Sequence, residues 1–159
     1  MMDFAAGGVA IMLPRIAITR IWSDDDVAQL AFEVCDGVSL FRNEAYVALD
    51  WGEKTAAALR TFGEQVYGGL FNMEAGAEGP EYASGSFRAR FHFYKPNQLL
   101  ISTSQQGDFF PFKRTEVAPE ARMFLRTEPN LLDTFTVDLR SLDASVGGQA
   151  ILECVPLSA

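Results

Sequence analysis

The side chains best suited to chemistry in this sequence lie in one short segment near its middle. Arg88, Arg90, His92 and Tyr94 occupy every second position, so they would share one face of a β-strand. Two guanidiniums, an imidazole and a phenol in a row can bind an acidic ligand or a carboxylate of a partner protein. The same row also fits a solvated strand face that pairs with acids such as Glu33 across a sheet. Both interpretations are open at this point.

His92 is the only histidine of the chain. One histidine can act as a general base, but it cannot form a histidine-rich metal site. The run Asp24-Asp25-Asp26 lacks the alternating oxygen ligands, central glycine and terminal glutamate of a calcium-binding loop, and is predicted to be a solvated turn. The sequence therefore predicts no catalytic residues, no metal site and no cofactor.

A second candidate surface is the aromatic segment Phe109-Phe110-Pro111-Phe112, which Lys113 follows directly. Exposed aromatic clusters mark interfaces, where large rigid side chains contribute most of the binding energy. The alternative is that the segment folds back and closes one end of the sheet, which would bury the rings. Taken together, the predicted partner-binding residues are Phe109, Phe110, Phe112, Arg88, Arg90, His92 and Tyr94.

Length and composition indicate one globular domain. The chain has 159 residues, of which 48% are hydrophobic and 21% charged, and its formal net charge is -8. This charge disfavours binding to nucleic acid and to anionic membranes. Cys35 and Cys154 lie far apart and outside any metal-binding spacing, which predicts reduced thiols and a cytoplasmic location. Residues 1–14 are predicted to be a loosely ordered leader, or the product of an upstream start codon, and residues 15–159 a single α+β domain.

The chemistry-bearing row is predicted to lie on a central hairpin over residues 84–105. The aromatic and small residues at 87, 89, 91 and 93 alternate with the polar row and would form its buried face. The segment Lys95-Pro96-Asn97-Gln98 suits a type I turn, with proline at the second position and asparagine at the third. Leu99 and Ile101 then continue the buried face on the returning strand. A half-buried hairpin with one basic outer face is the expected frame of the site.

The other elements are predicted from periodicity and from turn residues, and no sequence repeat is evident. Asp50 is expected to cap a first helix together with Glu53, and Gly68-Gly69 to end it. Strands are expected at 15–22, 27–35, 38–49, 121–126 and 149–155, a loop at 71–83 and a second helix at about 130–142. Short connections favour antiparallel pairing. The predicted fold class is α+β, with a mainly antiparallel sheet of about six to seven strands and two amphipathic helices packed on one face.

The order of these elements carries a resemblance to a known group, over roughly residues 30–155. The residues concerned are Leu59, Phe62, Val66, Gly68 and Gly69, the hairpin at 87–101, then Leu132, Phe135, Leu139 and Leu142, and the segment 148–154. In this outline the chain resembles the WapI-type immunity proteins and related small bacterial families. The resemblance implies a non-enzymatic protein that binds and blocks a cognate toxin, and it brings no catalytic residues.

Two functions are therefore expected as alternatives. A homodimer is compatible with either of them. The first is a protein-binding domain, immunity-like, that uses the aromatic segment or the polar row. The second is a small-ligand-binding protein or an enzyme with a pocket between sheet and helices. Phe32, Phe91 and Phe93 would line that pocket, and His92 or Glu33 would supply its polar group.

Overall fold

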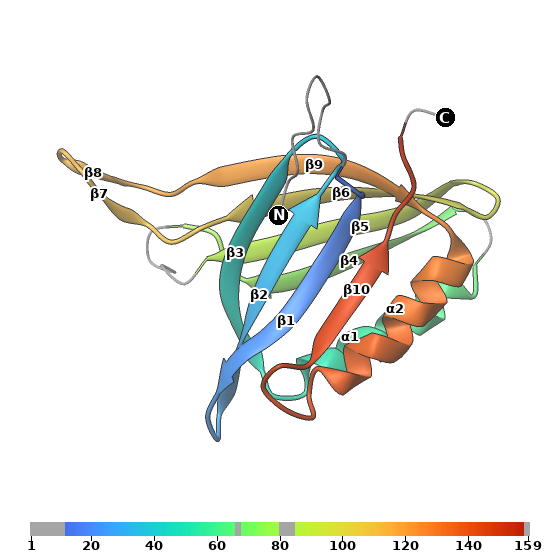
Figure 1. Cartoon of the computed structure of the whole chain (residues 1–159), viewed down its shortest axis with the longest axis horizontal. Coiled ribbons are helices and arrows are strands. Elements are labelled where there is room, and N and C mark those ends of the chain that lie inside the picture. Colours follow the sequence, from blue (N-terminus) through green and yellow to red (C-terminus); the bar gives the residue numbers. More distant parts are fainter. Residues whose placement is uncertain (1–11, 66–67, 80–84, 158–159) are drawn as a thin grey trace, which may run out of the picture.

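Two four-stranded antiparallel sheets cross steeply, as Figure 1 shows for a computed structural model of the chain. The structure describes residues 12–65, 68–79 and 85–157, so residues 1–11 of the predicted leader lie outside it. The first sheet has the order β10-β1-β2-β3 and the second the order β4-β5-β6-β9. The strands of the first sheet are β1 (Arg15–Ser23), β2 (Val27–Cys35), β3 (Leu40–Ala48) and β10 (Gln149–Glu153); those of the second are β4 (Gly68–Gly76), β5 (Ser86–Lys95), β6 (Gln98–Gln106) and β9 (Glu120–Thr127).

Each helix carries the chain from one sheet to the other. α1 (Trp51–Gly63) leads from β3 in the first sheet to β4 in the second, and α2 (Pro129–Ser141) leads from β9 back to β10. Apart from the small hairpin of β7 (Phe110–Phe112) and β8 (Thr115–Val117) between β6 and β9, the order of three strands, a helix and a strand occurs twice. Each half gives its last strand to the sheet of the other half. The sequence shows no corresponding repeat.

The predicted α+β class and antiparallel pairing are confirmed, whereas the prediction of a single sheet of about six to seven strands is wrong. Short connections correctly indicate which strands pair within each half, but periodicity does not show that a helix crosses to a second sheet. The two helices pack together at the side of the molecule, where α2 lies beside β10 and α1 contacts β4 (Figure 1).

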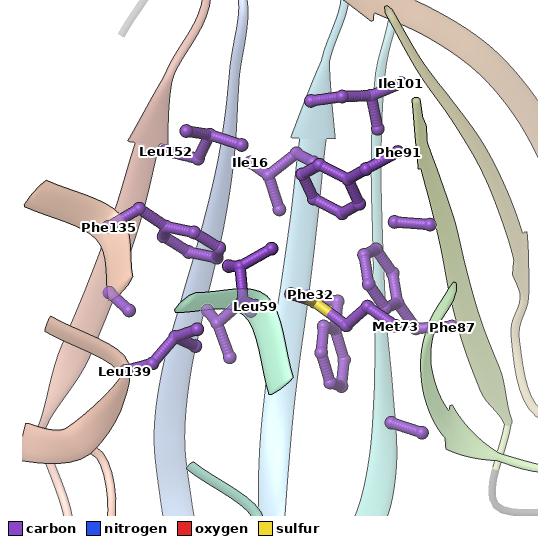
Figure 2. Packing of buried hydrophobic residues seen from close by; sticks show 14 of the residues in the cluster. Ile16, Phe32, Leu59, Met73, Phe87, Phe91, Ile101, Phe135, Leu139 and Leu152 are labelled. Atoms are coloured by element: carbon purple, nitrogen blue, oxygen red, sulfur yellow. The ribbon is translucent and has the colours of Figure 1, made fainter. Parts of the chain in front are cut away.

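The core lies between the inner faces of the two sheets and is closed by the helices. Phe87, Ala89, Phe91 and Phe93 are all buried, which confirms the predicted alternation of β5. Phe87 stacks on Phe32 of the first sheet with ring centroids 4.4 Å apart, so aromatic packing joins the sheets. In Figure 2, Leu59 from α1 and Phe135 and Leu139 from α2 point into the same cluster.

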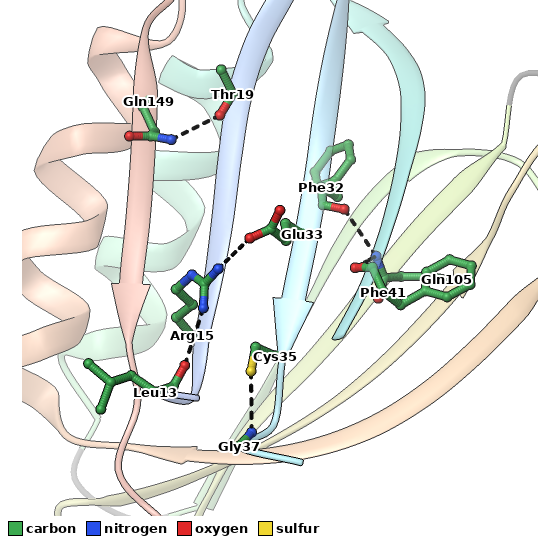
Figure 3. A network of polar contacts seen from close by, with 10 residues as sticks. All are labelled: Leu13, Arg15, Thr19, Phe32, Glu33, Cys35, Gly37, Phe41, Gln105 and Gln149. Atoms are coloured by element: carbon green, nitrogen blue, oxygen red, sulfur yellow. Dashed lines mark hydrogen bonds and ion pairs between the residues drawn. The ribbon is translucent and has the colours of Figure 1, made fainter. Parts of the chain in front are cut away.

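A buried polar contact also ties the two sheets together. The side chain of Gln105, on β6, reaches the first sheet and donates to the carbonyl oxygens of Phe32 (3.2 Å) and Phe41 (3.3 Å), as Figure 3 shows. Asn43, on β3, donates in the opposite direction to the carbonyl oxygens of Ser86 (2.8 Å) and Gln106 (3.0 Å). Gln105 also donates to Asn43 Oδ1 at 2.9 Å. These amides fix the second sheet against β2 and β3.

The first helix begins and ends differently from the prediction. The Asp50 side chain makes no capping hydrogen bond, and the carboxylate of Asp143 accepts from the first amides of α1 instead. The helix ends at Gly63, while Gly68 and Gly69 begin β4, so the predicted glycine ending is wrong. Val66, named above with the first helix, lies outside the described residues.

Two further local predictions are wrong. The segment 71–83, expected to be a loop, contains most of β4, because Met73 and Ala75 alternate inward and are buried despite the glycine- and acid-rich composition. The part of this segment beyond residue 79 lies outside the described residues. At the hairpin turn Asn97 has a φ of 61°, whereas the third position of a type I turn requires about -90°. Asparagine tolerates this left-handed conformation better than most residues.

Candidate functional site: the outer face of the second sheet

The outer face of the second sheet brings the predicted polar row together with side chains from three other strands. Strand register places these side chains in rows that run across the sheet. We call this surface the arginine face. Its three rows are Glu74–Arg88–Ser104–Arg122, Asn72–Arg90–Ser102–Phe124 and Leu70–His92–Leu100–Arg126, each written in the order β4, β5, β6 and β9.

A hollow of about 810 Å³ lies over the first two rows. It is open to solvent and is lined by residues of all four strands, β4, β5, β6 and β9. Arg88, Arg90 and Arg122 line it on either side of Ser102 and Ser104. The strands therefore place three guanidiniums around two hydroxyl groups on one surface, an arrangement that donates hydrogen bonds to acidic groups.

The acidic side chains of the hollow lie at its margin. Glu74 is on the edge strand β4 and approaches Arg88 with an Nε–Oε1 distance of 3.9 Å, and both side chains are more than half exposed. Glu78 follows β4, and Glu120, at the start of β9, accepts from the Gln106 side chain at 2.9 Å. Within the described part of the chain, Arg122 takes part in none of the ion pairs. Arg90 Nε donates to Asn72 Oδ1 at 3.4 Å. Arg88 and Arg90 thus each have one exposed neighbour on β4, and their remaining N–H groups and those of Arg122, on the opposite edge strand β9, are available to a ligand.

His92 and Tyr94 do not add a catalytic arrangement to this surface. The cross-strand neighbours of His92 are Leu70 and Leu100, whose side chains offer no hydrogen-bond partner that could orient an imidazole. Among the described residues, none of the side-chain hydrogen bonds involves His92. Tyr94 donates to Gln98 Oε1 at 2.7 Å, across the turn of the hairpin. Both side chains are partly exposed and can contribute contact area at this end of the face.

The aromatic segment forms a hairpin that projects from the body of the protein (Figure 1). β7 (Phe110–Phe112) pairs with β8 (Thr115–Val117), and we call residues 107–119 the arm. The rings of Phe110 and Phe112 are 51% and 53% exposed, and Phe109 is half-buried. The Lys113 ammonium lies 5.6 Å from the centre of the Phe112 ring. The segment therefore does not close the end of a sheet, and two of its rings face solvent.

The arm continues the hairpin of β6 and β9, two of the strands that form the arginine face. The predicted site residues thus fall into two groups on one continuous part of the fold.

Sequence reasoning missed Arg122 and Asn72. Residues 121–126 were expected to form a strand, but only the pairing of β9 with β6 places Arg122 beside Ser104. Asn72 was missed because its strand was predicted to be a loop.

The alternative pocket between sheet and helices is not supported by the residues proposed for it. Phe32, Phe91 and Phe93 are packed in the core, with exposed fractions of 0%, 0% and 3%. His92 lies on the outer face of the second sheet. Glu33 lies on the outer face of the first sheet and pairs with Arg15, so it does not pair with the polar row (Figure 3). Neither His92 nor Glu33 therefore points into the predicted pocket between sheet and helices.

The described residues include no group of three histidine, cysteine, aspartate or glutamate side chains that could hold a metal ion. Within the same ranges, no helix has both the length and the apolar character needed to cross a bilayer. None of the family models, curated proteins or solved structures compared with the chain matches it.

Proposed function

We propose that this chain is a non-enzymatic binding domain that holds an acidic protein partner on the arginine face. The observation that carries the proposal is the placement of charge. The chain has a net charge of -8 and 13 lysines and arginines, yet Arg88, Arg90, Arg122 and Arg126 share one sheet face. Glu74 is the one acidic side chain in the three rows of this face, and Glu78 and Glu120 lie at the margin of the hollow. Complementary charge of this kind steers association and selects among partners, because like-charged surfaces repel.

The arm supplies the apolar part of the proposed interface. Exposed Phe110 and Phe112 provide large rigid side chains, which contribute strongly to binding when a partner covers them. The arm projects from the same strands as the arginine face, so one partner can contact both. The resemblance to WapI-type immunity proteins makes an acidic surface of a toxin domain the particular partner that we propose, and binding would block that toxin.

The test uses the protein encoded beside this chain as the first candidate partner. We expect the purified pair to form a complex whose dissociation constant rises with salt concentration. The double variant Arg88→Glu with Arg90→Glu should lose the complex, because it reverses the charge on β5. Arg60→Glu, on an exposed position of α1, is the matched control and should bind as the wild type does.

A second variant tests the arm separately. Phe110→Ser with Phe112→Ser should weaken the complex and leave the thermal midpoint unchanged, because both rings are already half exposed. Sedimentation at two protein concentrations shows whether the chain itself dimerises.

A complex that forms equally well with the wild type and with the charge-reversed protein would show that the arginine face is not the interface.

A further inference from the structure

We propose that Arg88 and Arg122 together bind one carboxylate of the partner, directly above Ser104. This inference rests on the proposed function and names the contact at its centre. Ser104 on β6 is opposite Arg88 of β5 on one side and opposite Arg122 of β9 on the other. All three side chains line the hollow. The row thus presents a hydroxyl group between two guanidiniums.

The spacing of the strands suits convergence on a single group. Adjacent strands lie about 4.8 Å apart, so the backbones at Arg88 and Arg122 are roughly 10 Å apart with Ser104 midway. Arg88 Nε lies 3.9 Å from Glu74 Oε1 on the other side, and because both side chains are more than half exposed this contact is weak and can be exchanged for a ligand. The two long arginine side chains can then bend toward each other over a serine, whose short side chain leaves the space above it open. A carboxylate has about four acceptor positions, enough for hydrogen bonds from both guanidiniums and the hydroxyl.

The next row explains why the carboxylate belongs to a protein segment. Arg90 lies two residues from Arg88 on the same strand, about 7 Å away, beside Asn72 and Ser102. An extended segment repeats its side chains on one side at the same spacing, so acidic residues at alternate positions match both rows. The hollow is open and Arg88 is 57% exposed, so a small anion would remain hydrated there and bind weakly. A covering segment excludes water and strengthens the same contacts.

The test is a titration with a short blocked peptide that has glutamates at alternate positions, compared with the same peptide carrying glutamines. We expect the glutamate peptide to bind at low salt and to shift the backbone amide resonance of Ser104, and the glutamine peptide to bind at least tenfold more weakly. Arg122→Gln should weaken the glutamate peptide about fivefold, the upper range for one exposed ion pair. Ser104→Ala should weaken it by less, and Arg60→Gln on α1 should leave it unchanged.

Several outcomes would overturn the carboxylate site. These are equal binding of the two peptides, Arg122→Gln behaving like Arg60→Gln, or inorganic phosphate binding more tightly than the glutamate peptide. If a variant does not fold, the wild-type protein still tests the site. The glutamate peptide must shift the backbone amide resonance of Ser104, and this measurement requires no substitution. A peptide that fails to bind while Arg88→Glu with Arg90→Glu still loses the protein partner refutes this site and leaves the proposed function standing. Retention of the partner by that variant refutes both.

Discussion

The carboxylate of Asp143 caps the first helix through the backbone of Gly52. Asp143 Oδ1 accepts from the Gly52 amide at 3.0 Å, and Oδ2 accepts from the Glu53 amide at 2.8 Å. Asp143 follows α2, 91 residues along the chain from Gly52, so the end of one helix satisfies the start of the other. A negative charge at this position also interacts favourably with the helix dipole.

Removal of this cap should destabilise the protein. We predict that Asp143→Ala lowers the free energy of unfolding by about 1 kcal/mol, because the two amides at the start of α1 lose their acceptors. Asp143→Asn keeps one oxygen acceptor and should cost less. Urea unfolding measures the difference, with Asp25→Ala in an exposed turn as the control. An equal loss in Asp143→Ala and Asp25→Ala would show that the cap does not contribute.

Substitution by alanine should have opposite effects on protein stability at the two glycines of α1. A Cβ at Gly52 would lie 2.2 Å from the Leu139 carbonyl oxygen, so Gly52→Ala must push the helices apart. We predict a loss of about 1–3 kcal/mol, the usual range for overpacking. A Cβ at Gly63 would meet only Leu132 Cδ2 at 3.7 Å, an ordinary contact, so Gly63→Ala should be neutral or stabilising. Thermal unfolding of the two variants compares them, and equal midpoints would contradict the close approach of the helices at Gly52.

The pair of glycines also shows where sequence reasoning succeeds and where it stops. A glycine inside a helix suggests close packing, but the structure shows the close approach at Gly52 and not at Gly63. Periodicity correctly located α2 and both strands of the central hairpin, because alternating buried residues such as Phe87 and Phe91 are a local property. The cap from Asp143 and the row that joins Arg88 to Arg122 depend on pairing between distant segments. No local pattern in the sequence reveals such contacts.

The contact of Asn43 with the second sheet gives a prediction that depends on pH. Its side-chain nitrogen donates to the carbonyl oxygens of Ser86 and Gln106, and it is 5% exposed. We predict that Asn43→Asp destabilises the protein at neutral pH by more than about 3 kcal/mol, because a buried carboxylate cannot donate to these oxygens and repels them.

Protonation of the new carboxyl group should partly restore the stability of Asn43→Asp. Its pKa in the folded state would be raised by burial and by the facing carbonyls, so the lost stability returns as the pH falls toward the value for an unfolded aspartate, about 4. Urea unfolding at pH 7 and pH 5 measures this, with Asn72→Asp on the exposed outer face as the control. A penalty that is the same at both pH values would contradict the role of the Asn43 amide as a donor.

The half-buried Cys154 gives the last prediction. Desolvation raises the pKa of its thiol to about 12, so the folded protein keeps this thiol neutral well above pH 9, where the unfolded chain begins to ionise it. The stabilising contribution is therefore complete below pH 9 and is lost progressively as the pH rises toward 12. Cys154→Ala should show a smaller loss of unfolding free energy between pH 8 and pH 10.5 than the wild type does. The small cavity that alanine leaves shifts stability equally at every pH, so the difference between the two slopes isolates the thiol, and parallel slopes would refute the prediction.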